Sequence, residues 1–177
     1  MPQPCATPPI VTDSKMNLNT AQRCATLVNL AYDQFAQWVD QGYPEPAKFV
    51  WKVNHPPFQL SAPLWGNAVV LDVSNPEPFG FVAFDASDNS VYVAFRGTMT
   101  AADQWNDAYY AQVPYTLVTN PDFGKVHGGF YGVYTTPVTD RLGSLENQTN
   151  SAISTFNQSR PIKKAYFTGH SLGAALC

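Results

Sequence analysis

The last twelve residues of the chain, YFTGHSLGAALC, constrain its fold more than any other stretch. They run from an apolar segment of strand character into LGAAL, which favours a helix, and Ser171 stands at the junction. Gly169 and Gly173 flank this serine in the G-x-S-x-G pattern, because side chains there would clash with the adjoining strand and helix. The stretch predicts a nucleophilic serine held on a strand–turn–helix, with a purely structural glycine turn as the alternative.

The rest of the chain predicts an α/β fold. Apolar residues recur at spacings of three and four over residues 19–40, which predicts an amphipathic helix. Strands separated by the turn signals SNPEP and SDNS follow, and then a strand–helix–strand unit. Strands are predicted at 67–73, 79–87, 90–97, 111–117 and 163–169, a short helix at 101–110, and a helical region at 130–156 broken near Pro137 and Gly143. This order predicts a mixed, mostly parallel sheet with flanking helices, and Ser171 at the carboxyl edge of its parallel part.

Composition bounds the domain count and the partners. A chain of 177 residues has the size of one domain, and four prolines in the first fifteen residues predict a flexible arm over 1–16. Residues 17–177 then form part of one domain. A net charge of −3 without a basic run argues against nucleic acid as a partner. Neither a signal peptide nor an apolar run of roughly 18 residues is visible, so a cytoplasmic location is the default expectation.

Four separated motifs extend the pattern around Ser171. They are VYVAFRGT at 91–98, DQWND at 103–107, VHGGFYGVY at 126–134 and YFTGHSLGAAL at 166–176. In this order and spacing they resemble the class 3 lipase family, the fungal-lipase-like branch of the α/β-hydrolases. The resemblance holds from about Asn67 onward and implies the N-terminal portion of that fold: an incomplete α/β-hydrolase ending just after the nucleophile turn.

The resemblance also implies roles for individual residues. Ser171 corresponds to the acyl-accepting nucleophile, and the backbone N–H groups of Leu172 and Thr98 to the oxyanion hole. Residues 99–110 correspond to a lid, which would touch lipid transiently; a surface helix packed on its own sheet is the alternative. A structural polar cluster is implied for Arg96, Asp107 and His127, although the spacing of Trp105 and Asp107 is one residue shorter than in the family.

The triad acid and base are absent from this chain, because the family places Asp or Glu and then His after the nucleophile. The three histidines His55, His127 and His170 all precede Ser171 and none is expected to replace the base. The expected function is therefore hydrolysis of carboxylic esters of the acylglycerol type through an acyl-serine, weak or absent in the isolated chain. One alternative is a non-catalytic half that needs a complementary chain carrying the Asp and His, or that self-associates through an open sheet edge. Another is a different acyl-transfer enzyme: a phospholipase, thioesterase or acyltransferase.

No cofactor is expected. Family members use no organic cofactor, and no group of His, Asp or Glu has the spacing of metal ligands. The three cysteines, Cys5, Cys24 and Cys177, are too widely spaced to predict a zinc site or a disulfide framework.

Overall fold

The structure is a computed structural model that describes residues 17–70, 73–99, 111–118 and 124–177. The predicted arm at 1–16, most of the lid segment at 99–110, and Asp107 with it, lie outside the described residues. The prediction of an arm and the prediction of a lid therefore stay predictions.

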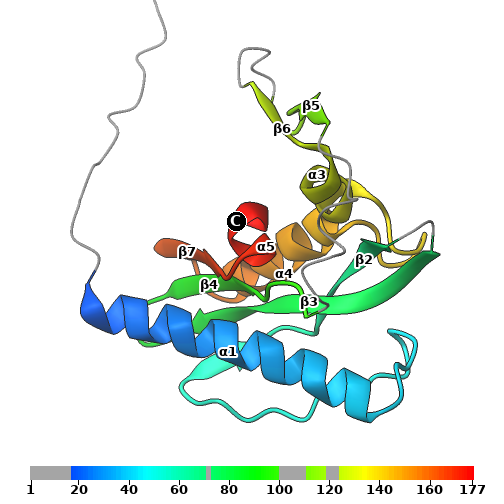
Figure 1. Ribbon diagram of the computed structural model, residues 1–177. Coiled ribbons are helices and arrows are strands. Elements are labelled where there is room, and N and C mark those ends of the chain that lie inside the picture. The colour runs from blue at the N-terminus through cyan, green and yellow to red at the C-terminus, as the bar shows by residue number, and fades with distance from the viewer. Residues whose placement is uncertain (1–16, 71–72, 100–110, 119–123) are drawn as a thin grey trace, which may run out of the picture.

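A five-stranded sheet forms the centre of the structure (Figure 1). Its strands are β1 (Phe58–Leu60), β2 (Leu64–Val70), β3 (Val73–Asp85), β4 (Ser90–Phe95) and β7 (Lys164–Gly169). They lie in the order β1-β3-β4-β7, with β2 also paired to β3. A separate two-stranded ribbon joins β5 (Gln112–Pro114) and β6 (Lys125–His127). The predictions of a meander and of a mixed sheet are confirmed.

The expectation of mostly parallel pairing is wrong for the described strands. Pairs β1–β3, β2–β3 and β3–β4 are antiparallel, and only β4–β7 is parallel. Short connections join the first strands and permit only antiparallel neighbours, whereas the long crossover through the helices allows β7 to lie parallel to β4.

The segment SNPEP is part of β3 rather than a turn. Pro76 pairs with Asn67 and Pro78 with Trp65 of β2, while β4 pairs with β3 only from Gly80 onward. Here β3 has a partner on one side only, and a proline, which lacks an N–H, is tolerated where that side of the strand is unpaired. The turn signal from proline and asparagine was therefore overridden by tertiary pairing.

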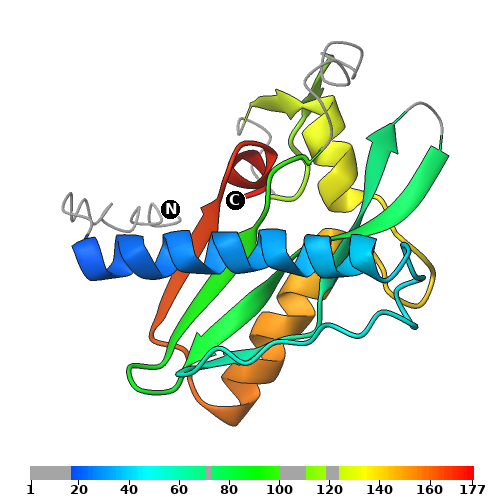
Figure 2. The same cartoon turned by 60° about the horizontal axis from the view of Figure 1, so that its bottom comes forward.

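One face of the sheet is covered by α1 (Leu18–Asp40), which crosses the strands in Figure 2. Its Leu27 and Ala31 are fully buried and pack against Phe81 of β3 and Tyr92 of β4. The helix predicted over 19–40 is confirmed, but its N-cap is Asn17, whose side chain accepts from the N–H of Asn19.

The opposite face is covered by three helices, α3 (Gly128–Thr135), α4 (Leu145–Ser159) and α5 (Leu172–Leu176). The predicted break between two helices is confirmed, and Ser144 with Asn147 forms a capping box at the start of α4. All six residues of β4 are buried because the strand has helices on both faces and strands on both sides.

Candidate active site

Ser171 lies on a sharp turn between β7 and α5, with φ 53° and ψ −118°. A Cβ added at Gly169 would lie 2.2 Å from the backbone carbonyl of Gly173, and one at Gly173 would lie 2.5 Å from the carbonyl oxygen of Phe95. Both glycines are therefore required by close backbone contacts. A positive φ at a non-glycine residue is strained, and such strain gathers at functional sites. The predicted strand–turn–helix is present, with Ser171 itself exposed.

The hydroxyl of Ser171 has no hydrogen-bond partner within the described part of the chain. Gly173 N–H donates to the carbonyl of His170 at 2.9 Å, and Ala174 N–H donates to that of Ser171 at 3.0 Å. These two bonds stabilise the turn, while the N–H of Leu172 has no acceptor among the same residues. The turn thus presents a hydroxyl and an adjacent N–H that are both available to a ligand.

Thr98 follows the carboxyl end of β4 and approaches the same turn. The parallel register pairs Phe95 with Gly169, so both strands end at one edge of the sheet. A Cβ added at Gly97 would lie 3.1 Å from Cβ of Ser171. The Oγ1 of Thr98 is buried and has no hydrogen-bond partner among the described residues. The structure therefore brings together the segments of Thr98, Ser171 and Leu172.

Tyr32 of α1 joins the two segments and was not predicted from the sequence. Its hydroxyl accepts a hydrogen bond from Gly97 N–H at 3.0 Å and lies 2.8 Å from Nδ1 of His170. The tautomer of His170 sets which of these two atoms donates to the other. Tyr32 lies next to the buried Ala31 on the helix face, and no local sequence signal marks it as part of a site.

The predicted polar cluster stays a prediction, because Asp107 lies outside the described residues. Arg96 is fully buried and its Nη2 lies 2.7 Å from Oε1 of Glu77. Burial lowers the pKa of Arg96, and the Glu77 carboxylate opposes this shift. His127 is the N-cap of α3, where its Nδ1 accepts from Phe130 N–H at 3.4 Å. Glu77 was missed because it lies within the segment that predicted a turn.

Residues 92–177 match the family described as Lipase (class 3). This part of the chain is similar to the class 3 lipase family. Over 128 residues the chain is 30% identical to phospholipase A1-II 1 of Oryza sativa subsp. indica, which covers 63% of this chain and 32% of the rice protein. It is 34% identical over 107 residues to phospholipase A1-II 3 of the same plant, covering 54% of this chain and 25% of that protein.

Solved lipase structures share the fold. The Rhizomucor miehei triacylglyceride lipase superposes with a TM-score of 0.55 at 20% identity, over 91% of this chain and 53% of the lipase chain. The Lip2 lipase from Yarrowia lipolytica gives a TM-score of 0.56 at 20% identity, over 91% and 52%. The chain thus spans about half the length of these lipases and about a third of the first rice relative. The prediction of a partial α/β-hydrolase fold is confirmed.

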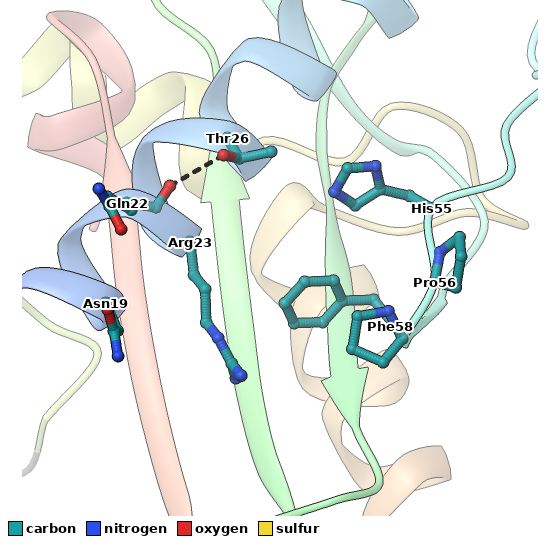
Figure 3. A pocket seen from close by; sticks show the side chains of 8 residues that line it. Asn19, Gln22, Arg23, Thr26, His55, Pro56 and Phe58 are labelled. Carbon is teal, nitrogen blue, oxygen red and sulfur yellow. Dashed lines mark hydrogen bonds between the residues drawn. The ribbon is translucent and has the colours of Figure 1, made fainter.

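A hollow of about 340 Å³ between α1 and the start of β1 lies away from Ser171. Figure 3 shows Arg23 of α1 on one side of this hollow, and His55 with Phe58, the first residue of β1, on the other. Phe58 pairs with Asp85, at the end of β3 opposite to the turn of Ser171. Because the length of β4, from Ser90 to Phe95, separates the two levels, this hollow is not placed to receive an acyl chain bound at Ser171.

The described residues offer neither a cluster of metal ligands nor a helix that could cross a membrane. Among these residues, no three His, Cys, Asp or Glu side chains gather closely enough to hold a metal ion. None of the helices formed by residues 17–70, 73–99, 111–118 and 124–177 combines the length and apolar character needed to cross a membrane.

Proposed function

We propose that this chain is the nucleophile-bearing half of a serine hydrolase that cleaves lipid esters. The observation that carries the proposal is the strained turn of Ser171 at the same sheet edge as Thr98, with a free hydroxyl and unpartnered donors beside it. The match of residues 92–177 to the class 3 lipase family supports the same chemistry.

In the proposed reaction the Oγ of Ser171 attacks the ester carbonyl carbon and its proton passes to a general base. The N–H groups of Leu172 and Thr98 donate to the oxyanion of the tetrahedral intermediate, a contribution of about 3–4 kcal/mol for one such donor. The alcohol leaves with a proton from the base, and water then hydrolyses the acyl-serine to release the acid. Each step needs a base that no described residue supplies to Ser171.

We propose that the base and its orienting carboxylate come from a complementary polypeptide segment. The edge of β7 has no strand partner on its outer side within the described sheet. Phe167 on this strand is 53% exposed and aligns with the buried Val93 of β4, so an added strand would bury it. A second copy of the chain is the alternative occupant of this edge.

The proposed substrate class is an acylglycerol or a phospholipid, which share a carboxylic ester on a glycerol backbone. The relatives from rice are named phospholipases A1 and the fungal neighbours are named triacylglycerol lipases, so the headgroup is left to experiment. The segment 99–110 is proposed to contact the lipid interface, and Met99 at its start is 50% exposed.

Chemical rescue tests the function without the missing base. Imidazole is added as an external base to the purified chain with p-nitrophenyl butyrate, and the rate is compared with those of Ser171→Ala and Ser151→Ala. Ser151 is an exposed serine of α4 and serves as the matched control. General-base catalysis contributes about 10²–10⁴-fold, so we expect an imidazole-dependent rate that Ser171→Ala abolishes and Ser151→Ala retains. The same imidazole-dependent rate in all three proteins would refute the proposal.

The substrate class is tested next under the same conditions. Triolein and phosphatidylcholine dispersions separate the two headgroups, and a fatty acyl thioester tests the alternative acyl chemistry. Release of fatty acid from either glycerolipid, dependent on Ser171, supports the proposal; turnover of the thioester alone contradicts it.

A further inference from the structure

Arg96 is held by more contacts than a buried ion pair requires. Its guanidinium lies between the rings of Phe35 and Phe79, 4.0 Å and 4.6 Å from their centroids. Nη2 lies 2.7 Å from Glu77 Oε1, and Nε donates to the carbonyl of Pro78 at 2.8 Å. The two rings set the plane of the guanidinium, and β3 fixes its position within that plane.

The third polar contact of this guanidinium is directed towards the candidate active site. Nη1 of Arg96 donates to the carbonyl oxygen of Gly97 at 2.7 Å. This carbonyl and the N–H of Thr98 belong to one trans peptide unit, in which the two groups point in opposite directions. Holding the Gly97 oxygen on the Arg96 side therefore directs the Thr98 N–H to the opposite side.

The same short segment is also held against the turn of Ser171. A Cβ added at Gly97 would lie 2.7 Å from the carbonyl oxygen of His170 and 2.7 Å from the hydroxyl of Tyr32. Gly97 N–H donates to that hydroxyl. The position of the Gly97–Thr98 peptide relative to Ser171 is thus set by close contact, and its rotation is set by Arg96.

We propose, on the basis of the hydrolase function proposed above, that Arg96 is a positioning residue that keeps the Thr98 N–H available to the oxyanion. Rotation of this peptide by half a turn would place the Gly97 carbonyl oxygen at the oxyanion position, where two negative oxygens repel. A charged donor on the carbonyl opposes that rotation, because a hydrogen bond to a charged group is roughly twice as strong as a neutral one. A purely structural ion pair would need Glu77 alone and no bond to Gly97.

The sequence offers a selective probe of this peptide. Gly97–Thr98 is the only Gly–Thr pair among the 177 residues. A chain labelled with ¹³C at glycine carbonyls and ¹⁵N at threonine therefore gives a single carbonyl–amide NMR correlation, which reports this peptide without further assignment. The measurement requires a folded chain and no turnover.

Arg96→Lys is compared with Arg23→Lys, a matched control with a second arginine that pairs with a buried carboxylate. Arg23 Nη1 lies 2.6 Å from Oδ2 of Asp85, at the end of the sheet opposite to Ser171. Lysine keeps the charge but lacks the planar fork that spans Glu77 and Gly97. We expect the Gly97–Thr98 correlation to shift or split in Arg96→Lys and to stay in place in Arg23→Lys. An unchanged correlation in Arg96→Lys overturns the proposal.

If Arg96→Lys does not fold, relaxation dispersion of the unmodified chain tests whether the Gly97–Thr98 peptide is fixed. A flat profile for the single correlation is expected from a peptide fixed at its carbonyl, and microsecond–millisecond exchange of that peak overturns the proposal.

Imidazole-supported hydrolysis provides the functional readout. Loss of one oxyanion donor costs about 10²–10³-fold in kcat, so we expect Arg96→Lys to lower kcat about tenfold or more. KM stays unchanged in both variants, and kcat stays unchanged in Arg23→Lys. An equal loss of kcat in the two variants overturns the proposal. If the unmodified chain shows no hydrolysis that depends on Ser171, the proposed function fails, while the NMR correlation still decides how this peptide is positioned.

Discussion

Asp85→Asn tests the account of how α1 is attached to the sheet. The carboxylate of Asp85 is fully buried at the end of β3 and accepts from Arg23 at 2.6 Å and from the N–H and hydroxyl of Ser87 at 2.9 Å and 2.6 Å. Asparagine keeps the shape but loses the charge and turns one acceptor into a donor. Breaking a buried pair costs about 3–5 kcal/mol. The side chain of Arg23 is 40% exposed, so water partly solvates its charge once the pair is lost. We therefore expect the free energy of unfolding to fall by about 3 kcal/mol.

Low pH should remove the stabilisation by the Asp85 carboxylate from the unmodified protein. Burial by itself raises the pKa of Asp85, but hydrogen bonds from Ser87 and the charge of Arg23 outweigh it and hold that pKa below its usual value. A lowered pKa in the folded state stabilises the fold above the pKa of the unfolded carboxyl, about 3.9, and this stabilisation is lost as the pH falls through the folded value. The difference in free energy of unfolding between the unmodified protein and Asp85→Asn should therefore narrow below about pH 4.

The assay is thermal and urea unfolding followed by circular dichroism at pH 7 and pH 3, with Asp33→Asn as the control on the exposed face of α1. A loss of about 3 kcal/mol corresponds to a decrease in Tm of about 6–12 °C for a chain of this size. An Asp85→Asn protein as stable as Asp33→Asn at pH 7, or a difference in free energy of unfolding that does not narrow between pH 7 and pH 3, would refute the reasoning.

The other predictions concern single substitutions measured by the same unfolding assay. Gly173→Ala should lose about 3 kcal/mol or more because its Cβ meets a carbonyl oxygen of β4, whereas Gly132→Ala, with nothing within 4 Å, should gain about 0.5–1 kcal/mol. Equal free energies of unfolding for Gly173→Ala and Gly132→Ala would contradict the close contact of Gly173 with β4. Tyr32→Phe should cost about 1 kcal/mol and shift the NMR resonances of the His170 ring; an unmoved ring signal would exclude the hydrogen bond. Ser144→Ala should cost about 1 kcal/mol through loss of the capping box of α4, and no change would show that this cap is not needed.

The elements that the sequence predicted well are those governed by local chemistry. The helix over 19–40 followed from apolar spacing, and the structure has it at Leu18–Asp40. The strand–turn–helix at Ser171 followed from two glycines, and the structure shows the backbone contacts that exclude any other residue there. Both depend on residues within a few positions of one another, so a short stretch of sequence contains the information.

Features that depend on residues far apart in the chain were missed. The segment SNPEP carries strong turn signals, yet it lies in β3 because β2 supplies a partner strand. Tyr32 and Gly97 are 65 positions apart, and only the packing of α1 on the sheet brings the phenol hydroxyl to that peptide. Glu77 likewise meets Arg96 only because β3 and β4 are adjacent.

The sequence alone therefore determined that Ser171 stands on a tight turn, since a side chain at either flanking glycine would collide with backbone wherever this turn forms. Only the tertiary structure decided what surrounds that serine. The parallel pairing of β4 and β7 aligns Phe95 with Gly169 and so places Thr98 beside the turn. Arg96 orients the intervening peptide through a bond whose geometry depends on two aromatic rings, one from α1 and one from β3. Conformation over a few residues follows from steric exclusion, whereas the approach of distant groups follows from which faces the folded chain buries together.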